Sequence, residues 1–138
     1  MSTPLPSTDT EYVDENRRRE FLEWLNTAKS EPTKYKGLFH YTDPELRDRL
    51  DKLLGDIYEP GFKRWVLKLE GRCSLVSPEG YGEMIVLSGQ PKIGSGPVLK
   101  VGSINKITDA DVISPPMQCV HIYAYKRKGN DNAQPGGD

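Results

Sequence analysis

The apolar positions in the first quarter of the chain follow a helical period. Between Asp14 and Ala28, apolar side chains recur every three or four residues, which is the spacing of one face of an amphipathic helix. Pro32 cannot continue such a helix and marks its end. The pattern therefore predicts a first helix over about 14–28, whose stripe consists of Phe21, Leu22, Leu25 and Ala28, with Trp24 on its flank.

A second helix follows a clear start signal. Residues 42–45 read Thr-Asp-Pro-Glu, a capping box with proline in the first turn, where a missing N–H costs nothing. Apolar residues then recur on one face, charged residues of alternating sign occupy the other, and Pro60 and Gly61 end the pattern. The face that we expect to be buried consists of Leu46, Leu50, Leu53, Leu54 and Ile57.

From Phe62 onward the period changes to two, which indicates strands. A first strand bends at Gly71, because a glycine within a strand often marks a bulge. One parity of this strand is apolar and the other is polar. The apolar parity, expected to face the core, consists of Trp65, Leu67, Leu69, Cys73 and Leu75.

Three more strands are expected at 81–88, 98–107 and 117–126. Strands that follow one another through short turns form an antiparallel sheet. The predicted fold class is α+β, with two N-terminal helices packed on a four- to five-stranded antiparallel sheet. Because a strand kinked at glycine also occurs in small barrels, the alternative is a sheet curled into a partly open barrel like that of oligonucleotide-binding (OB) domains.

The last strand has two unlike faces. Val120 and Ile122 belong to its most apolar parity, so we expect them to point into the core. The other parity, with Cys119 and His121, is then expected to face solvent. On this assignment Cys73 is the more buried thiol, and the two cysteines cannot pair because they lie on opposite faces of the sheet.

The composition is that of a globular protein with distinct ends. Apolar residues make up 36% and charged residues 28% of the 138 residues, which lies within the range of folded domains and away from that of disordered chains. The two ends hold almost no large apolar side chain. We therefore expect a disordered arm over 1–10, a single domain over 11–128 and a disordered tail over 129–138.

The sequence also indicates a soluble intracellular protein of the cytoplasm or nucleus. Residues 1–10 lack the basic start and apolar stretch of a signal peptide. The longest apolar run, Met84–Leu87, is far too short to span a bilayer. Two cysteines are too few for a disulfide framework, so we expect free thiols in a reducing compartment.

No pattern in the chain specifies catalysis. His40 and His121 are its two histidines, and no nucleophile stands at a diagnostic spacing from either. Cys119 and His121 could hold zinc together with Cys73, but no acidic residue lies near them in the sequence. The glycine-rich stretch 94–97 precedes a strand rather than a helix, unlike a phosphate-binding loop. We expect no enzymatic activity, no metal and no small-molecule cofactor.

Aromatic and basic side chains gather on the polar parity of the predicted strands. Rings on a sheet flanked by cations suit single-stranded nucleic acid, whose bases stack and whose phosphates pair with the cations. The same residue types are also ordinary on exposed strands. The candidate binding surface consists of His121, Tyr123, Tyr125, Lys126, Arg127, Lys128, Arg64, Lys68, Arg72 and Tyr81.

The overall charge favours a different partner. Nineteen basic and twenty acidic residues give a net charge of −1, whereas proteins that coat nucleic acid usually carry a positive excess. Exposed aromatic residues and sheet edges serve protein partners equally well. We therefore expect a non-catalytic binding protein. It is expected to be a small subunit or structural component of a larger protein or nucleoprotein assembly, or to associate with itself. A module that binds single-stranded nucleic acid is the alternative.

Overall fold

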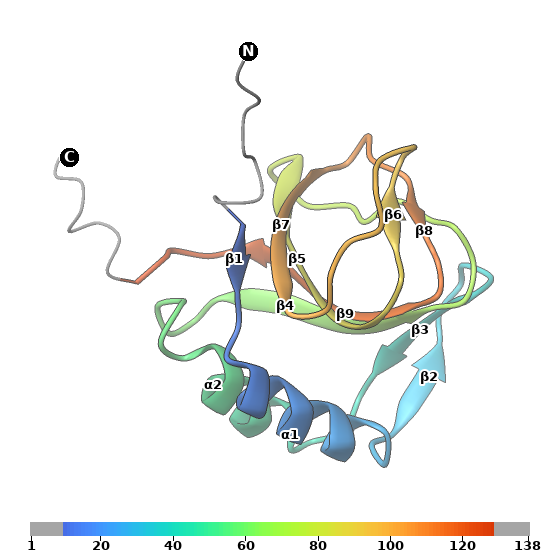
Figure 1. Cartoon of the computed structure of the whole chain (residues 1–138). Helices are drawn as coiled ribbons and strands as arrows, with labels where there is room; N and C mark the ends of the chain where they lie inside the picture. The colour runs from blue at the N-terminus through green and yellow to red at the C-terminus, as the bar shows by residue number, and fades with distance from the viewer. Residues whose placement is uncertain (1–9, 129–138) are drawn as a thin grey trace, which may run out of the picture.

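The main sheet carries both helices on one side (Figure 1). The computed structural model describes residues 10–128. Seven antiparallel strands form this sheet in the order β1-β7-β5-β9-β4-β3-β2, and two further strands pair separately, so the α+β class is confirmed. The elements are β1 Glu11–Tyr12, α1 Glu15–Leu25, β2 Ser30–Pro32, β3 Leu38–Tyr41, α2 Leu46–Leu54, β4 Lys63–Leu69, β5 Tyr81–Gly89, β6 Lys92–Ile93, β7 Ser103–Thr108, β8 Ile113–Ser114 and β9 Met117–Ala124.

Both predicted helices are present, but one start differs from the prediction. In α1, the Asp14 carboxylate accepts a hydrogen bond from the backbone N–H of Arg17 at 2.9 Å, a standard N-cap contact. The predicted capping box of α2 is wrong. This helix has Glu45 as its N-cap, so Thr42 lies too early in the chain to cap it, and the Thr42 hydroxyl is buried without a hydrogen-bond partner. The burial of Leu50 is confirmed, since its side chain is 1% exposed.

The two helices are not consecutive, contrary to the prediction. Strand β1 precedes α1, and the β2–β3 hairpin occupies residues 30–41, which were expected to form a connector. Strand β2 reads Ser-Glu-Pro, so it contains no alternation of apolar and polar residues that would predict a strand. It lies at the edge of the sheet, where Pro32 is tolerated. The main sheet consequently has seven strands rather than four or five.

The sheet is buried on both faces, so the prediction of one apolar and one polar face is wrong. The helix-side core contains Phe21, Leu50, Val66, Ile85 and Val120, among others. A second core lies on the opposite face, where β8 and the segment after β4 cover the sheet. It is formed by Leu67, Leu69, Leu75, Met84, Val86, Ile107, Ile113, Met117 and Cys119.

The register of β4 with β9 corrects the predicted faces. Trp65 is directly opposed to His121, and Leu67 to Cys119, so each pair lies on the same face of the sheet. The sequence pattern predicts instead that Trp65 and Leu67 face the core and that Cys119 and His121 face solvent. Trp65 was expected in the core and is 49% exposed, whereas Cys119 was expected to be the more exposed thiol and is fully buried. Cys73 is half-buried, and both thiols are free.

The main sheet curves without closing into a barrel. Strands β1 and β2 remain as its two edges, and the short β6–β8 ladder lies across the face opposite the helices (Figure 1). Among residues 10–128, no helix is long and apolar enough to cross a membrane. Apart from Thr10, the predicted arm and tail lie outside the described residues.

Candidate functional site

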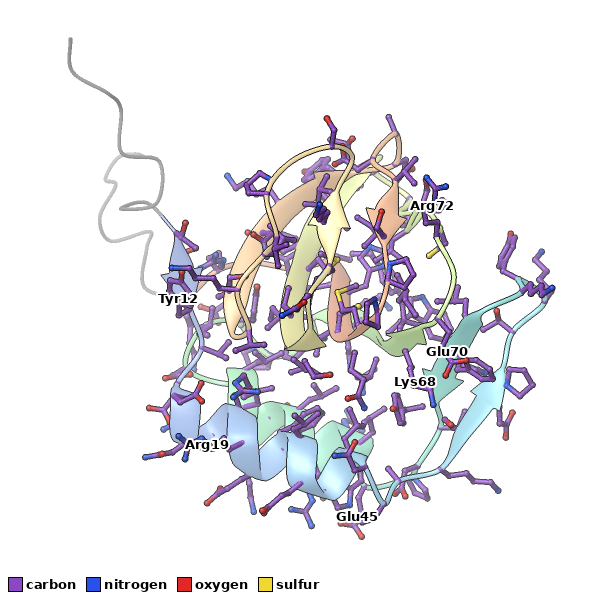
Figure 2. The ribbon with its side chains drawn as sticks, turned by 45° about the vertical axis from the view of Figure 1, so that its right-hand side comes forward. Tyr12, Arg19, Glu45, Lys68, Glu70 and Arg72 are labelled. Atoms are coloured by element: carbon purple, nitrogen blue, oxygen red, sulfur yellow. The ribbon has the colours of Figure 1, made fainter. Side chains whose placement is uncertain are left out.

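A cavity of about 870 Å³ opens between the β2–β3 hairpin and the segment 72–76 that follows β4. We call it the groove. Its floor comes from β4 and β9, which supply Trp65, Leu67 and His121. Figure 2 shows how the β2–β3 hairpin projects from the body of the protein and faces the side that carries Arg72.

Three of the residues that line the groove belong to a row of four rings, which continues to Tyr123 outside the cavity. The ring centroids of His40 and Trp65 are 5.9 Å apart, and Trp65 stacks on Tyr123 at 6.3 Å with an interplanar angle of 23°. Tyr123 in turn lies 5.9 Å from the ring of His121. The register brings these rings together, because β9 pairs with β4 and β4 pairs with β3. We call these four residues the aromatic row, and Trp65 is its most exposed member.

Three cations lie around the rim of the groove. Lys34 and Lys36 belong to the hairpin turn, and Arg72 belongs to the opposite wall. Within residues 10–128, none of the three takes part in a salt bridge, and no acidic residue lines the groove. The amine of Lys34 lies 5.3 Å above the ring of Tyr35. The groove therefore combines an apolar floor with an uncompensated positive rim.

A buried hydrogen bond fixes the wall of the groove to its floor. It joins Ser77 Oγ and His121 Nε2 at 3.0 Å. Burial lowers the pKa of His121 to about 4, although the nearby Asp109 carboxylate acts in the opposite direction. His121 is therefore neutral near pH 7. The two partners are 44 positions apart in the sequence, which explains why no sequence pattern revealed this contact.

The Ser77–His121 pair lacks the arrangement of a catalytic dyad. The Asp109 carboxylate accepts a hydrogen bond from the backbone N–H of Ser77 at 2.9 Å, and within residues 10–128 no hydrogen bond joins it to the histidine ring that it would have to orient. The side chain of Ser77 is buried and does not line the groove. A molecule in the groove would therefore meet His121 but not the serine hydroxyl. The pair serves to hold the wall in place.

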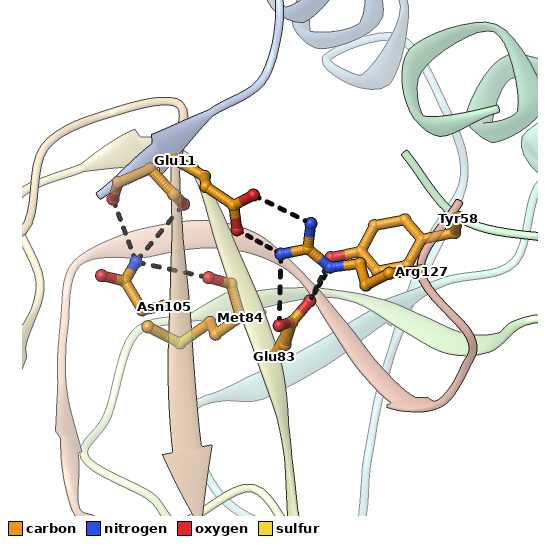
Figure 3. Close-up of polar contacts among 7 residues, drawn as sticks. Glu11, Tyr58, Glu83, Met84, Asn105 and Arg127 are labelled. Atoms are coloured by element: carbon orange, nitrogen blue, oxygen red, sulfur yellow. Dashed lines mark hydrogen bonds and ion pairs between the residues drawn. The ribbon is translucent and has the colours of Figure 1, made fainter. Parts of the chain in front are cut away.

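Part of the predicted binding surface belongs instead to a polar cluster on the other side of the sheet (Figure 3). Arg127 donates hydrogen bonds to Glu83 and to Glu11, which joins the end of the described chain to β5 and β1. The hydroxyl of Tyr58 donates to Glu83 Oε1 at 2.6 Å. These contacts raise the pKa of Arg127 despite its partial burial. Arg127 is thus a structural cation.

Tyr125 and Lys128 accompany Arg127 in this region. Tyr125 packs edge-on against Tyr58 at 5.6 Å and so lies on the helix side, away from Tyr123. Strand β9 ends at Ala124, so the alternation that predicted a shared face does not extend to Tyr125. The amine of Lys128 donates to the carbonyl oxygen of Gly55 at 2.8 Å.

The remaining predicted residues are dispersed. Lys68 forms a salt bridge with Glu70, and both are labelled in Figure 2. Lys126 is exposed, and Tyr81 is exposed on β5. Arg64 is half-buried and lines a second pocket beside the groove. The groove itself brings together two of the predicted residues and five that the sequence pattern missed. The two are His121 and Arg72, and the five are Lys34, Tyr35, Lys36, His40 and Trp65. Tyr123 stacks on Trp65 but does not line the groove.

The described part of the chain offers no metal centre. No group of three or more His, Cys, Asp or Glu side chains in residues 10–128 is arranged to hold a metal ion. No protein-family model matches the chain, and neither a curated protein nor a solved structure gives a significant match.

Proposed function

We propose that this chain is a non-catalytic binding protein that holds single-stranded nucleic acid in the groove. One observation carries the proposal: the half-exposed ring of Trp65 belongs to the aromatic row and lies beside three cations that form no salt bridge within residues 10–128. Unpaired bases expose flat faces that stack on aromatic side chains, and their phosphates require cations at the rim. The groove offers both within one cavity.

The distribution of charge supports a single strand over a duplex. A protein that coats duplex nucleic acid neutralises many phosphates and needs an extensive positive surface. The net charge of −1 does not supply one. The local excess at the groove is limited to Lys34, Lys36 and Arg72, which suits a short stretch of strand.

Fluorescence polarisation of a labelled oligothymidylate tests this proposal. Replacing Lys34, Lys36 and Arg72 together by alanine should weaken binding about tenfold or more at low salt. Each lost phosphate contact should also reduce the slope of log K against log salt by about 0.7, as expected for single strands. The matched control replaces Lys92, Lys100 and Lys106, three exposed lysines outside the groove, and should leave binding unchanged. Absence of binding by the wild-type protein at low salt contradicts the proposal.

A protein partner is the second candidate function, and the walls of the groove favour it. Val76 is 72% exposed, and Leu38, Leu67 and Leu75 also line the cavity. An acidic peptide with apolar anchors would fit this surface, as expected for a small subunit of a larger assembly. The test is light scattering across a range of concentrations together with a pull-down in which Val76→Asp is compared with the wild-type protein. A monomer that captures no protein at the groove excludes this candidate.

A further inference from the structure

A second pocket, of about 430 Å³, lies beside the groove. The charged residues that line it are Arg47 and Asp51 from α2 and Lys63 and Arg64 from β4. We infer that this pocket is a phosphate-binding extension of the groove, which holds the backbone of the same nucleic-acid strand beyond the aromatic row. We call it the basic pocket. The inference rests on the proposed function.

The two cavities meet at one stacked pair of rings. Tyr123 lines the basic pocket and stacks on Trp65, which lines the groove. Strand β4 connects the cavities in the same order, since Lys63 and Arg64 lie in the pocket whereas Trp65 and Leu67 lie in the groove. At about 3.3 Å per residue, Lys63 and Leu67 are roughly 13 Å apart along the strand. Arg64 shares the helix-side parity of β4 with Val66, whereas Trp65 and Leu67 point to the opposite face, so a chain that occupies both cavities has to pass over the Trp65–Tyr123 pair.

The charge of the basic pocket suits a phosphate. Three of its lining residues are cations and one, Asp51, is an anion. In the part of the chain that the structure describes, none of the three cations takes part in a salt bridge. Arginine binds phosphate through two parallel N–H donors, and Arg47 and Arg64 approach the pocket from different elements. The pocket thus supplies backbone contacts where the groove supplies stacking.

Oligonucleotide length provides the test. A strand of about 4 nucleotides, near the lower limit of known site sizes, should occupy the groove alone, whereas one of about 12 should also reach the basic pocket. The variant Arg47→Gln/Lys63→Gln changes two exposed side chains, so the fold should be unaffected. We expect it to weaken binding of the longer strand about tenfold at low salt and to leave the shorter strand unaffected. The matched control is Lys100→Gln/Lys106→Gln, which should alter neither.

The outcomes separate this inference from the proposed function. If Arg47→Gln/Lys63→Gln binds both strands like the wild-type protein, whereas Trp65→Ala weakens both, the basic pocket is not part of the site and the proposed function stands. If the variant weakens both strands equally, the extension is contradicted, because the pocket would then act on a strand too short to reach it. If the wild-type protein binds neither strand at low salt, the proposed function fails and the inference fails with it.

Discussion

Trp65 on β4 and His121 on β9 are directly opposed in register, so their side chains lie on the same face of the sheet. Their environments nevertheless differ, because Trp65 is 49% exposed and His121 is 2% exposed. The segment after β4 covers His121 through Ser77 and leaves Trp65 open. The boundary between the buried second core and the open groove therefore runs between these two neighbours.

The pH dependence of stability should report the burial of His121. Its pKa in the folded protein is about 4, below its usual value of 6.5, so the unfolded chain binds more protons between these limits. The contribution is complete above about pH 6.5 and is lost progressively as the pH falls toward 4. Urea unfolding at pH 7 and pH 5 should show lower stability at pH 5, by about 1–2 kcal/mol.

The variant His121→Gln is the control for this pH dependence. It cannot be protonated in this range, and the fall in stability between pH 7 and pH 5 should largely disappear. Glu15, whose pKa is lowered to about 2 by hydrogen bonds with Arg18, loses its stabilising contribution only as the pH falls below the unfolded carboxylate value of 4.5, so it does not obscure the comparison. An equal fall in His121→Gln and the wild-type protein would show that other groups cause it.

Arg127 should contribute far more to stability than its neighbour Lys126. Replacing Arg127 by methionine leaves Glu83, which is 2% exposed, as a buried carboxylate without a cation. Breaking a buried ion pair in this way costs about 3–5 kcal/mol. Lys126→Met removes the same charge from an exposed position and should change the free energy of unfolding by less than about 0.5 kcal/mol. Urea denaturation of the two variants gives the comparison, and equal effects would contradict the structural role of Arg127.

The two thiols should react with disulfide reagents in a defined order. Burial raises the pKa of both, but Cys119 is fully buried and Cys73 is half-buried. The variant Cys119→Ser keeps the half-buried Cys73 and should retain the faster reaction in the native protein. The variant Cys73→Ser keeps only the buried Cys119 and should react only as the protein unfolds. The reagent 5,5′-dithiobis(2-nitrobenzoic acid) follows both by absorbance. Faster reaction of Cys119 would mean that the second core is open at this site.

The helices and the central strands were predictable because their apolar patterns are local. The face of α2 and the burial of Leu50 follow directly from helical spacing. The second core does have a sequence signal, but it is a continuous apolar run and not an alternation of apolar and polar residues. The run Met84–Leu87 is continuously apolar, which is typical of a strand buried on both faces. Because consecutive residues of a strand point to opposite faces, this run in β5 indicates that both faces of the sheet are apolar.

The groove could not be predicted by the same reasoning. Its hairpin wall contains Pro32 and a polar turn, with no period to identify strands. Its floor depends on the register of β4 with β9, and alternation within a single strand does not fix which residues of a distant strand are opposed. The contact between Ser77 and His121 likewise depends on tertiary structure. The set of residues that line the groove can therefore be identified only from the folded structure.

The most direct test of nucleic-acid binding is the fluorescence of Trp65. Trp24→Phe leaves Trp65 as the single tryptophan, and a base stacking on it should quench its emission as oligothymidylate is added at low salt. Trp65→Phe, in which Trp24 reports instead, is the matched control. We predict saturable quenching in Trp24→Phe that weakens as salt is raised, and none in Trp65→Phe. Unchanged emission in Trp24→Phe, or equal quenching in both variants, would contradict binding in the groove.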